Sequence, residues 1–145
     1  MKITHETRIK APMENVWNIL MDFSKYPDWN PLIPLVEGVA EPGAVLQAII
    51  NPPSFNRRKV DIEVTGYVPP KYFSFETHHK YGDWFYHEEM IFRMKEYEGG
   101  VNFIAEVYVT GLSLRFRRSR IEGAFRLSLF NIVQSLKERI ESGRF

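Results

Sequence analysis

The side chains best suited to acid–base chemistry gather around one predicted turn. His78 and His79 precede Gly82, and His87 and Glu88 follow it, so a β-hairpin that turns near Gly82 brings the two pairs close together. A carboxyl or imidazole group inside an apolar pocket has a shifted pKa and can transfer a proton or orient a ligand oxygen. Glu88, His87 and His78 are therefore the candidate catalytic residues. The alternative is that the histidines are exposed or hydrogen-bonded strand residues.

Other reactive arrangements find little support. His87-Glu88-Glu89 begins like a zinc-protease motif, but the second histidine is missing and the segment is typical of a strand. Two histidines with Glu88 or Glu89 are a conceivable metal site, although structural roles for strand histidines are far more common. The chain has no Cys, no serine in a G-x-S-x-G context and no glycine-rich phosphate loop. We expect neither a metal nor a cofactor.

Large apolar side chains recur on strand and helix faces that are predicted to point inward. Core packing explains most of such a set in any sheet and helix sandwich. The residues are nevertheless bulky enough to leave the interior partly open, and Met is a common lining residue of adaptable sites. The predicted ligand-binding residues are Trp84, Tyr86, Glu88, Met90, Phe92, Phe73, Phe75, Phe103, Phe125 and Leu129.

The strongest local charge feature consists of Arg115, Arg117, Arg118 and Arg120, at the predicted start of the last helix. Cations at a helix N-terminus oppose the helix dipole unless an anion or a carboxylate lies nearby. These arginines are candidate contacts for an acidic ligand group, an anionic lipid surface or an acidic partner protein. The alternative is a solvated surface with the arginines paired to strand carboxylates.

Composition limits the class of protein. The chain has 145 residues, is 44% hydrophobic and 26% charged, and carries a formal net charge of +1. This length favours one domain over residues 1–145 with a substantial core, and the apolar share excludes disorder. The sequence shows no signal peptide and no apolar run of membrane-spanning length, so we expect a soluble, cytoplasmic protein, as monomer or homodimer. The near-zero net charge gives no reason to expect a nucleic-acid partner.

Hydrophobic periodicity predicts an α+β architecture. A strand over 3–10 precedes a helix over 12–23 and a short helix or turn over 24–31. Six strands follow, over 35–41, 44–51, 57–68, 71–80, 84–96 and 101–110, and their connections are too short for crossover helices, so neighbours pair antiparallel. A last helix over 119–142 is apolar nearly all round, which indicates a helix enclosed by the sheet.

Two segments resemble a known group of proteins. Ile9-Lys10-Ala11-Pro12, continuing to Val16-Trp17 and then Tyr26-Pro27-Asp28-Trp29-Asn30-Pro31, resembles the opening of the polyketide cyclase/dehydrase-like branch of the START/Bet v 1 (SRPBCC) superfamily. Residues 130–139 are similar to the final helix of that group. The resemblance implies a helix-grip fold, in which a curved antiparallel sheet of about seven strands wraps around a long C-terminal helix. It also implies an elongated, mostly apolar cavity for lipids, sterols, polyketides or plant-hormone-like molecules.

Three functions remain open, since fold does not settle function. The leading expectation is binding of a small hydrophobic or aromatic ligand between the sheet and the C-terminal helix. The second is a polyketide cyclase/dehydratase-like enzyme that uses pocket His, Glu and Tyr side chains. The third is a lipid or quinone carrier, or a partner-binding module, that uses the arginines of residues 115–120 and touches a membrane peripherally. A strongly shifted His or Glu inside an open cavity favours the enzyme, and a purely apolar cavity favours the carrier.

Overall fold

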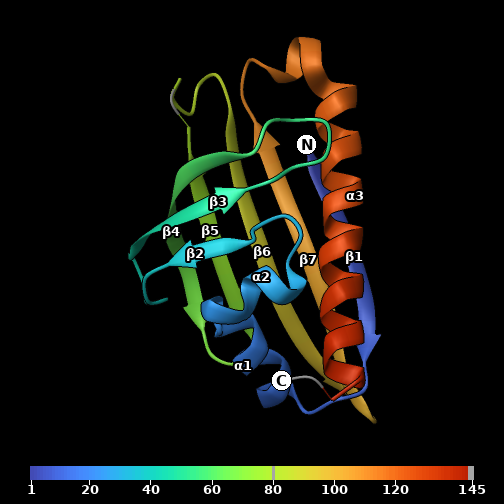
Figure 1. Ribbon diagram of the computed structural model, residues 1–145. Helices are drawn as coiled ribbons and strands as arrows, with labels where there is room; N and C mark the ends of the chain where they lie inside the picture. Colours follow the sequence, from blue (N-terminus) through green and yellow to red (C-terminus); the bar gives the residue numbers. More distant parts are fainter. Residues whose placement is uncertain (80, 144–145) are drawn as a thin grey trace.

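The computed structural model describes residues 1–79 and 81–143 (Figure 1). The strands are β1 (Lys2–Ile9), β2 (Leu35–Glu37), β3 (Val45–Ile50), β4 (Arg58–Val68), β5 (Tyr72–His78), β6 (His87–Tyr97) and β7 (Gly100–Thr110). The helices are α1 (Met13–Met21), the 3-10 turn η1 (Phe23–Lys25), α2 (Tyr26–Trp29) and α3 (Leu114–Glu141).

The strands form one seven-stranded sheet in the order β1-β7-β6-β5-β4-β3-β2. Every neighbouring pair is antiparallel, as the short connections predict. The sheet curves around α3, which contacts β1 and β7, and α1 and α2 lie at the opposite end of the molecule from the start of α3 (Figure 1). The predicted helix-grip fold is confirmed.

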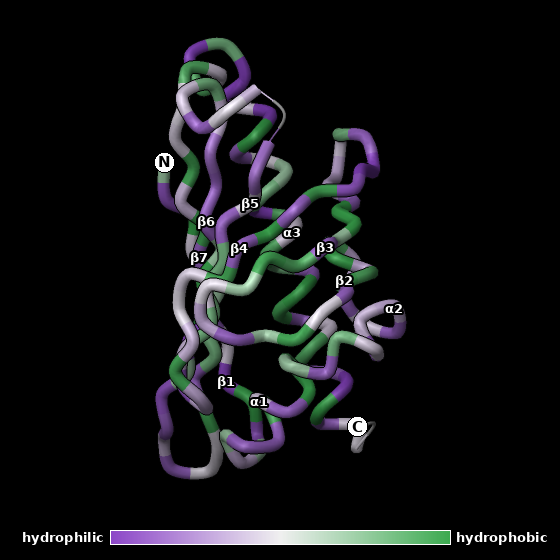
Figure 2. The backbone as a smooth tube through the Cα atoms, turned by 90° about the vertical axis from the view of Figure 1, so that its left-hand side faces the viewer, coloured by the Kyte–Doolittle hydropathy of each residue, from purple (hydrophilic) through white to green (hydrophobic). Residues whose placement is uncertain are grey.

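Alternate residues along the strands are buried, and they identify the inner face of the sheet. On β6, Glu88, Met90, Phe92 and Met94 are all buried on the side of α3, because successive strand side chains point to opposite faces. Figure 2 shows hydrophilic and hydrophobic stretches following one another along the strands. The same parity therefore places the carboxyl of Glu88 among apolar neighbours.

Two polar side chains of the Tyr-Pro-Asp-Trp-Asn-Pro segment around α2 hydrogen-bond to the backbone. The buried side chain of Asn30 accepts hydrogen bonds from the backbone N–H groups of Leu32 (3.1 Å) and Ile33 (2.8 Å). The Tyr26 hydroxyl donates to the carbonyl of Leu20, at the end of α1, over 2.5 Å. These bonds satisfy buried polar groups where prolines interrupt regular structure.

Several predicted boundaries differ from the observed ones. β2 stops at Glu37 because Gly38 has a φ of 122°, and a Cβ there would lie 2.5 Å from Leu46 Cδ2. β6 begins at His87, three residues later than predicted, because the backbone N–H groups of residues 85 and 86 both donate to the Gly82 carbonyl and form a turn. Lys80, the predicted end of the preceding strand, lies outside the described residues.

The C-terminal helix is longer and less enclosed than predicted. It begins at Leu114 rather than at residue 119, and Arg117 interrupts its helical geometry with φ −127° and ψ 16°. Leu127 and Phe130 are 49% and 48% exposed, so the expectation of a helix surrounded by sheet is wrong. The sheet covers one side of α3 only, because its two edge strands, β1 and β2, do not meet.

Candidate functional site

A cavity of about 460 Å³ lies between the sheet and α3. This volume falls within the roughly 300–1,000 Å³ that is usual for small-molecule sites. Most of its wall is apolar and is supplied by β3, β4, β5, β6 and α3. The main apolar lining residues are Ile33, Ile50, Val60, Phe75, Met90 and Phe125. An apolar molecule of moderate size therefore finds a matching environment here.

Three polar side chains of the cavity, Tyr86, Glu88 and His79, form a cluster that is called here the polar end. The Tyr86 hydroxyl donates a hydrogen bond of 2.5 Å to Glu88 Oε2, and His79 Nε2 lies 3.6 Å from Glu88 Oε1. The ring of His79 also packs edge-on against Tyr86, with 4.6 Å between centroids. Both oxygens of the buried Glu88 carboxylate thus face a polar group of this cluster, as a charge inside an apolar interior requires.

Opposing effects set the ionisation of this cluster. Burial raises the pKa of Glu88, but the His79 imidazole, the Tyr86 hydrogen bond and the charge of Arg58 together hold that pKa below its ordinary value. Burial raises the pKa of Tyr86 strongly, and the neighbouring Glu88 carboxylate raises it further. At neutral pH the pair therefore consists of a carboxylate that accepts and a phenol that donates.

Four predicted anion contacts separate into different environments. Arg117 lines the cavity, whereas Arg115 and Arg118 are exposed on the surface. Arg120 donates to the backbone carbonyl of Ser54 and lies over the Phe55 ring at 4.4 Å, which joins α3 to the loop between β3 and β4. The pattern of residues 115–120 did not distinguish these roles, because the kink at Arg117 redirects the chain there. Anion binding by any of them stays a prediction.

The predicted ligand-binding residues occupy three different environments. The residues that line the cavity are Phe75, Tyr86, Glu88, Met90 and Phe125. The residues buried in the packed core instead are Phe73, Phe92, Phe103 and Leu129. Trp84 is 71% exposed, and the expectation that it faces inward is wrong because strand alternation begins only at His87. Ligand contact by the first group stays a prediction.

The candidate catalytic histidines lie near carboxylates other than Glu88. His87 lies on the opposite strand face from Glu88, where its Nε2 is 3.6 Å from Glu76 Oε1 and its Nδ1 is 3.3 Å from Asp83 Oδ1. His78 borders the cavity, but its Nε2 lies 3.9 Å from Glu63 Oε2 on β4. The potential metal-ligating atoms of His78, Glu63 and Glu76 lie within 4.8 Å of one another. Glu88 alone of the three candidates belongs to the polar end.

Among the cavity residues that were not predicted from the sequence, Arg58 and His79 carry charged or titratable side chains that act on Glu88. Arg58 lies two residues before Val60 on β4 and shares its inward parity, so strand alternation was a usable signal. His79 immediately follows His78, and only the observed end of β5 shows which of the two reaches Glu88. The sequence predicted His78 as a catalytic candidate, whereas in the structure His79 is the histidine that lies next to Glu88.

The segment just before β6 hydrogen-bonds to the loop between β7 and α3. The backbone N–H of Leu112 donates to the Trp84 carbonyl (3.0 Å), and that of Ser113 donates to the Phe85 carbonyl (2.9 Å). Gly111 permits this approach, since a Cβ there would lie 2.4 Å from the Phe85 oxygen. These segments and the start of α3 expose a group of large side chains, called here the rim: Tyr81 (65% exposed), Trp84 (71%), Leu112 (41%) and Phe116 (65%).

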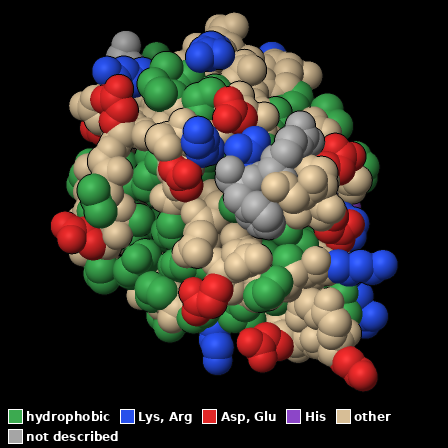
Figure 3. Space-filling view, turned by 60° about the horizontal axis from the view of Figure 1, so that its bottom comes forward, with side chains coloured by type: hydrophobic (Ala, Val, Ile, Leu, Met, Phe, Trp, Pro, Cys, Tyr) green, Lys and Arg blue, Asp and Glu red, His purple; other side chains and the backbone are tan. Residues whose placement is uncertain are grey.

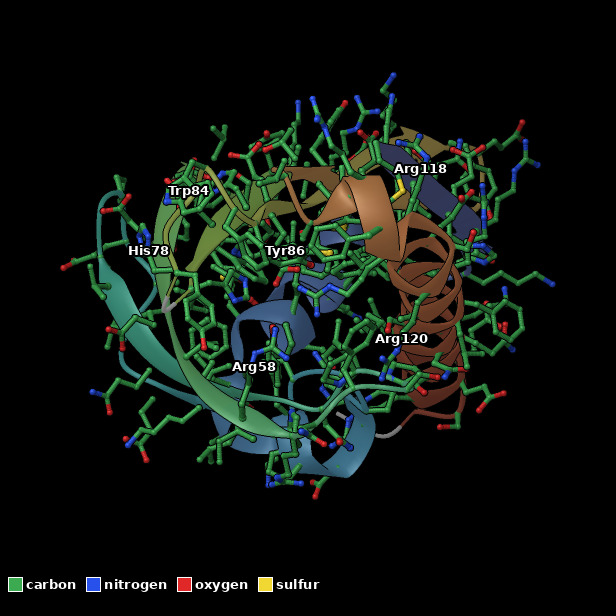
Figure 4. The ribbon with its side chains drawn as sticks, turned by 90° about the horizontal axis from the view of Figure 1, so that it is seen from above. Arg58, His78, Trp84, Tyr86, Arg118 and Arg120 are labelled. Atoms are coloured by element: carbon green, nitrogen blue, oxygen red, sulfur yellow. The ribbon has the colours of Figure 1, made fainter. Side chains whose placement is uncertain are left out.

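Figures 3 and 4 show the two ends of the molecule. At the end that comes forward in Figure 3, acidic and basic side chains are interspersed among hydrophobic ones. Figure 4 looks onto the other end, with Arg58 and Tyr86 over the space enclosed by the sheet and α3, and Trp84 and Arg118 at its edge.

Among the described helices, none combines the length and apolar character that crossing a bilayer requires.

Comparisons with solved structures agree with the fold. The protein TTHA0849 from Thermus thermophilus superimposes with a TM-score of 0.77 at 14% identity, over 100% of both chains. Ara h 8.0201 superimposes with a TM-score of 0.76 at 11% identity, over 99% of both chains. DynU16, described as a putative protein in the dynemicin biosynthetic locus, superimposes with a TM-score of 0.70 at 13% identity, over 98% of this chain and 48% of its own. At such identities the likeness concerns the fold alone.

Sequence comparison identifies the family. No curated protein matches the chain. The family described as polyketide cyclase/dehydrase and lipid transport matches residues 1–141, which is nearly the whole sequence. The resemblance inferred from the strand-to-helix turn at Pro12 and the motif around Trp29 is thereby confirmed. The chain belongs to the polyketide cyclase/dehydrase and lipid transport family.

Proposed function

We propose that this protein binds a small, largely apolar or aromatic ligand in the cavity between the sheet and α3. The observation that carries the proposal is a cavity of about 460 Å³ with many apolar lining residues and a polar cluster of Tyr86, Glu88 and His79. The apolar wall gains free energy by removing ligand surface from water, and the Glu88–Tyr86 pair orients a polar ligand group. Family membership supports the same class of ligand.

A cavity-blocking variant tests this proposal. Ala124 lines the cavity on α3, and Leu127 is 49% exposed on the same helix. Ala124→Phe fills part of the cavity, so the uncharged dye Nile red, which fluoresces in apolar sites, loses most of its binding. Leu127→Phe, the matched control, leaves binding unchanged. Native mass spectrometry of the purified protein identifies any molecule that co-purifies. Equal dye binding by both variants contradicts the proposal.

Proton-transfer catalysis is the second candidate, and the contact of His79 with Glu88 favours it. A carboxyl whose pKa lies below its ordinary value is a weak base, and a phenol with a raised pKa is a weak acid. Imidazole is the side chain that most often carries out general acid–base catalysis. If the protein acts as a cyclase or dehydratase, His79→Gln abolishes turnover while Nile red binding persists. Unchanged turnover in His79→Gln removes this candidate.

A peripheral membrane carrier is the third candidate, favoured by the rim. Aromatic side chains with nearby exposed arginines suit a bilayer interface, and each basic residue near an anionic surface contributes about 1 kcal/mol. Arg115 and Arg118 are exposed near the start of α3, as is Phe116. If the protein is such a carrier, it co-sediments with vesicles that contain phosphatidylserine. The double variant Arg115→Gln/Arg118→Gln weakens this binding. Equal recovery with neutral phosphatidylcholine vesicles contradicts a carrier that docks through these charges.

A further inference from the structure

Two arginines line the cavity without a carboxylate partner. Arg58 comes from β4 and Arg117 from the kink of α3, and both line the cavity. Neither forms an ion pair with any residue of the part of the chain that the structure describes. The guanidinium of Arg117 instead lies 5.8 Å from the Phe85 ring centroid and 5.9 Å from that of Phe116. Its Nε is buried and has no hydrogen-bond partner among the described residues.

The one carboxylate of the cavity does not compensate for these charges. Glu88 already accepts the hydrogen bond of Tyr86 and faces His79. Arg58 and Arg117 line the same cavity as Tyr86, and Arg117 lies against the ring of Phe85, the residue that precedes Tyr86. Two partly exposed guanidinium groups therefore share a largely apolar cavity with a single carboxylate among its described lining residues. An excess positive charge that is partly removed from water favours the binding of an anion.

We infer that the ligand is an amphipathic organic acid whose carboxylate binds between Arg58 and Arg117, a proposal that rests on the cavity being a ligand site. Planar guanidinium groups pair with carboxylates through two parallel N–H···O bonds and are well suited to buried ion pairs. The apolar body of the ligand then extends toward Met90 and Phe125. Arg118, which is exposed on the same helix, takes no part.

Three ten-carbon probes with the same tail distinguish the charge preference from simple apolar binding. Decanoic acid, decan-1-ol and decylamine compete with Nile red at pH 7.5, and each competition gives an apparent affinity. We expect decanoate to bind about tenfold or more tightly than decanol, because hydrogen bonds to charged groups contribute most to discrimination. Decylamine binds more weakly than decanol, since the arginines repel its ammonium group.

Substitutions of Arg58 and Arg117 test whether these two residues cause the preference for decanoate over decanol. Arg58→Gln and Arg117→Gln each reduce decanoate affinity by about tenfold and leave decanol affinity unchanged. Arg58→Lys keeps the charge, and we expect it to retain part of the decanoate affinity. This variant separates the effect of the charge from a loss of folding in the Gln variants. Arg118→Gln is the surface control and changes neither affinity. Circular dichroism checks that every variant is folded.

The outcomes separate this inference from the proposed function. Equal affinities for decanoate and decanol, with no effect of Arg58→Gln or Arg117→Gln, overturn the carboxylate site but leave the apolar ligand site intact. Tighter binding of decylamine also overturns it and assigns the polar end to a cation held by Glu88. Absence of Nile red binding in the unmodified protein overturns the ligand site itself, and the carboxylate site with it.

Discussion

The Tyr86 hydroxyl lies 2.5 Å from Glu88 Oε2, and the two residues are separated by a single position at the start of β6. Tyr86 ends the turn that begins at Gly82, and Glu88 is the second residue of β6, so their contact depends on how this turn leads into the strand. The hydrogen bond keeps a buried carboxylate ionised and fixes the direction of its free lone pairs. The pair therefore presents a defined polar edge to whatever occupies the cavity.

Removal of the Tyr86 hydroxyl raises the pKa of Glu88. In Tyr86→Phe the carboxylate loses one of the hydrogen bonds that lower its pKa, while burial continues to raise it. A carboxyl carbon titration followed by NMR, with selectively labelled glutamate, measures the change. Tyr67→Phe is a control, since Tyr67 is a partly buried tyrosine on β4 that does not line the cavity. An unchanged Glu88 titration in Tyr86→Phe contradicts the prediction.

The contribution of Glu88 to stability depends on pH. Its pKa is lower in the folded state than the ordinary value of 4.5, so its stabilisation is complete above pH 4.5 and declines as pH falls through the folded pKa. Glu88→Gln lowers the free energy of unfolding at pH 7 by about 1–3 kcal/mol. Urea unfolding across pH 3–7 shows this difference shrinking at low pH. Glu89→Gln, on the outer face of the same strand, changes stability by less than about 0.5 kcal/mol.

Core and cavity positions respond differently to truncation. Leu129 is fully buried away from the cavity, so Leu129→Ala lowers the free energy of unfolding by about 2–5 kcal/mol and leaves Nile red affinity of the folded protein unchanged. Phe125 lines the cavity, so Phe125→Ala also changes the affinity. Urea unfolding and dye titration measure the two effects. Altered dye affinity in Leu129→Ala contradicts the assignment of that residue to the core.

The buried Glu106 stabilises the outer face of the sheet. Its carboxylate pairs with Arg93, lies 3.8 Å from Lys2 Nζ and accepts a 3.3 Å hydrogen bond from the Tyr108 hydroxyl. Glu106→Gln therefore costs about 1–3 kcal/mol of unfolding free energy, since Arg93 loses its carboxylate but still reaches water. Glu122→Gln breaks only the exposed pair with Arg126 and costs about 0.3–0.5 kcal/mol. Equal costs contradict this account.

Trp84 reports on the rim. Trp17 and Trp29 are buried, whereas Trp84 is 71% exposed, so Trp84→Phe removes the part of the fluorescence that acrylamide quenches most readily. If the rim docks on a membrane, phosphatidylserine vesicles shift the Trp84 emission to shorter wavelength and protect it from acrylamide. The same vesicles leave the spectrum of Trp84→Phe unchanged. A vesicle-induced shift that persists in Trp84→Phe places the contact elsewhere.

Local patterns determined much of the architecture. Period-two burial and short connections predicted seven antiparallel strands, because each strand must turn one face toward a core. The spacing of Ile121, Phe125, Leu129 and Ile132 predicted a helix with a buried stripe, and these residues are buried in α3. The same parity placed Glu88 on the inner face. Such features depend on neighbours within a few residues, so the sequence alone contains them.

Only the tertiary structure decided which polar groups meet. Arg58 on β4, His79 after β5, Glu88 on β6 and Arg117 on α3 are far apart in sequence and line one cavity. The turn at Gly82 moved Trp84 to the surface, and the kink at Arg117 separated this residue from the exposed Arg115 and Arg118. Turn geometry and helix kinks shift side chains by one face or one position, which residue type and spacing do not specify. The candidate residue types were therefore evident from the sequence, and their partners depended on how sheet and helix close around the cavity.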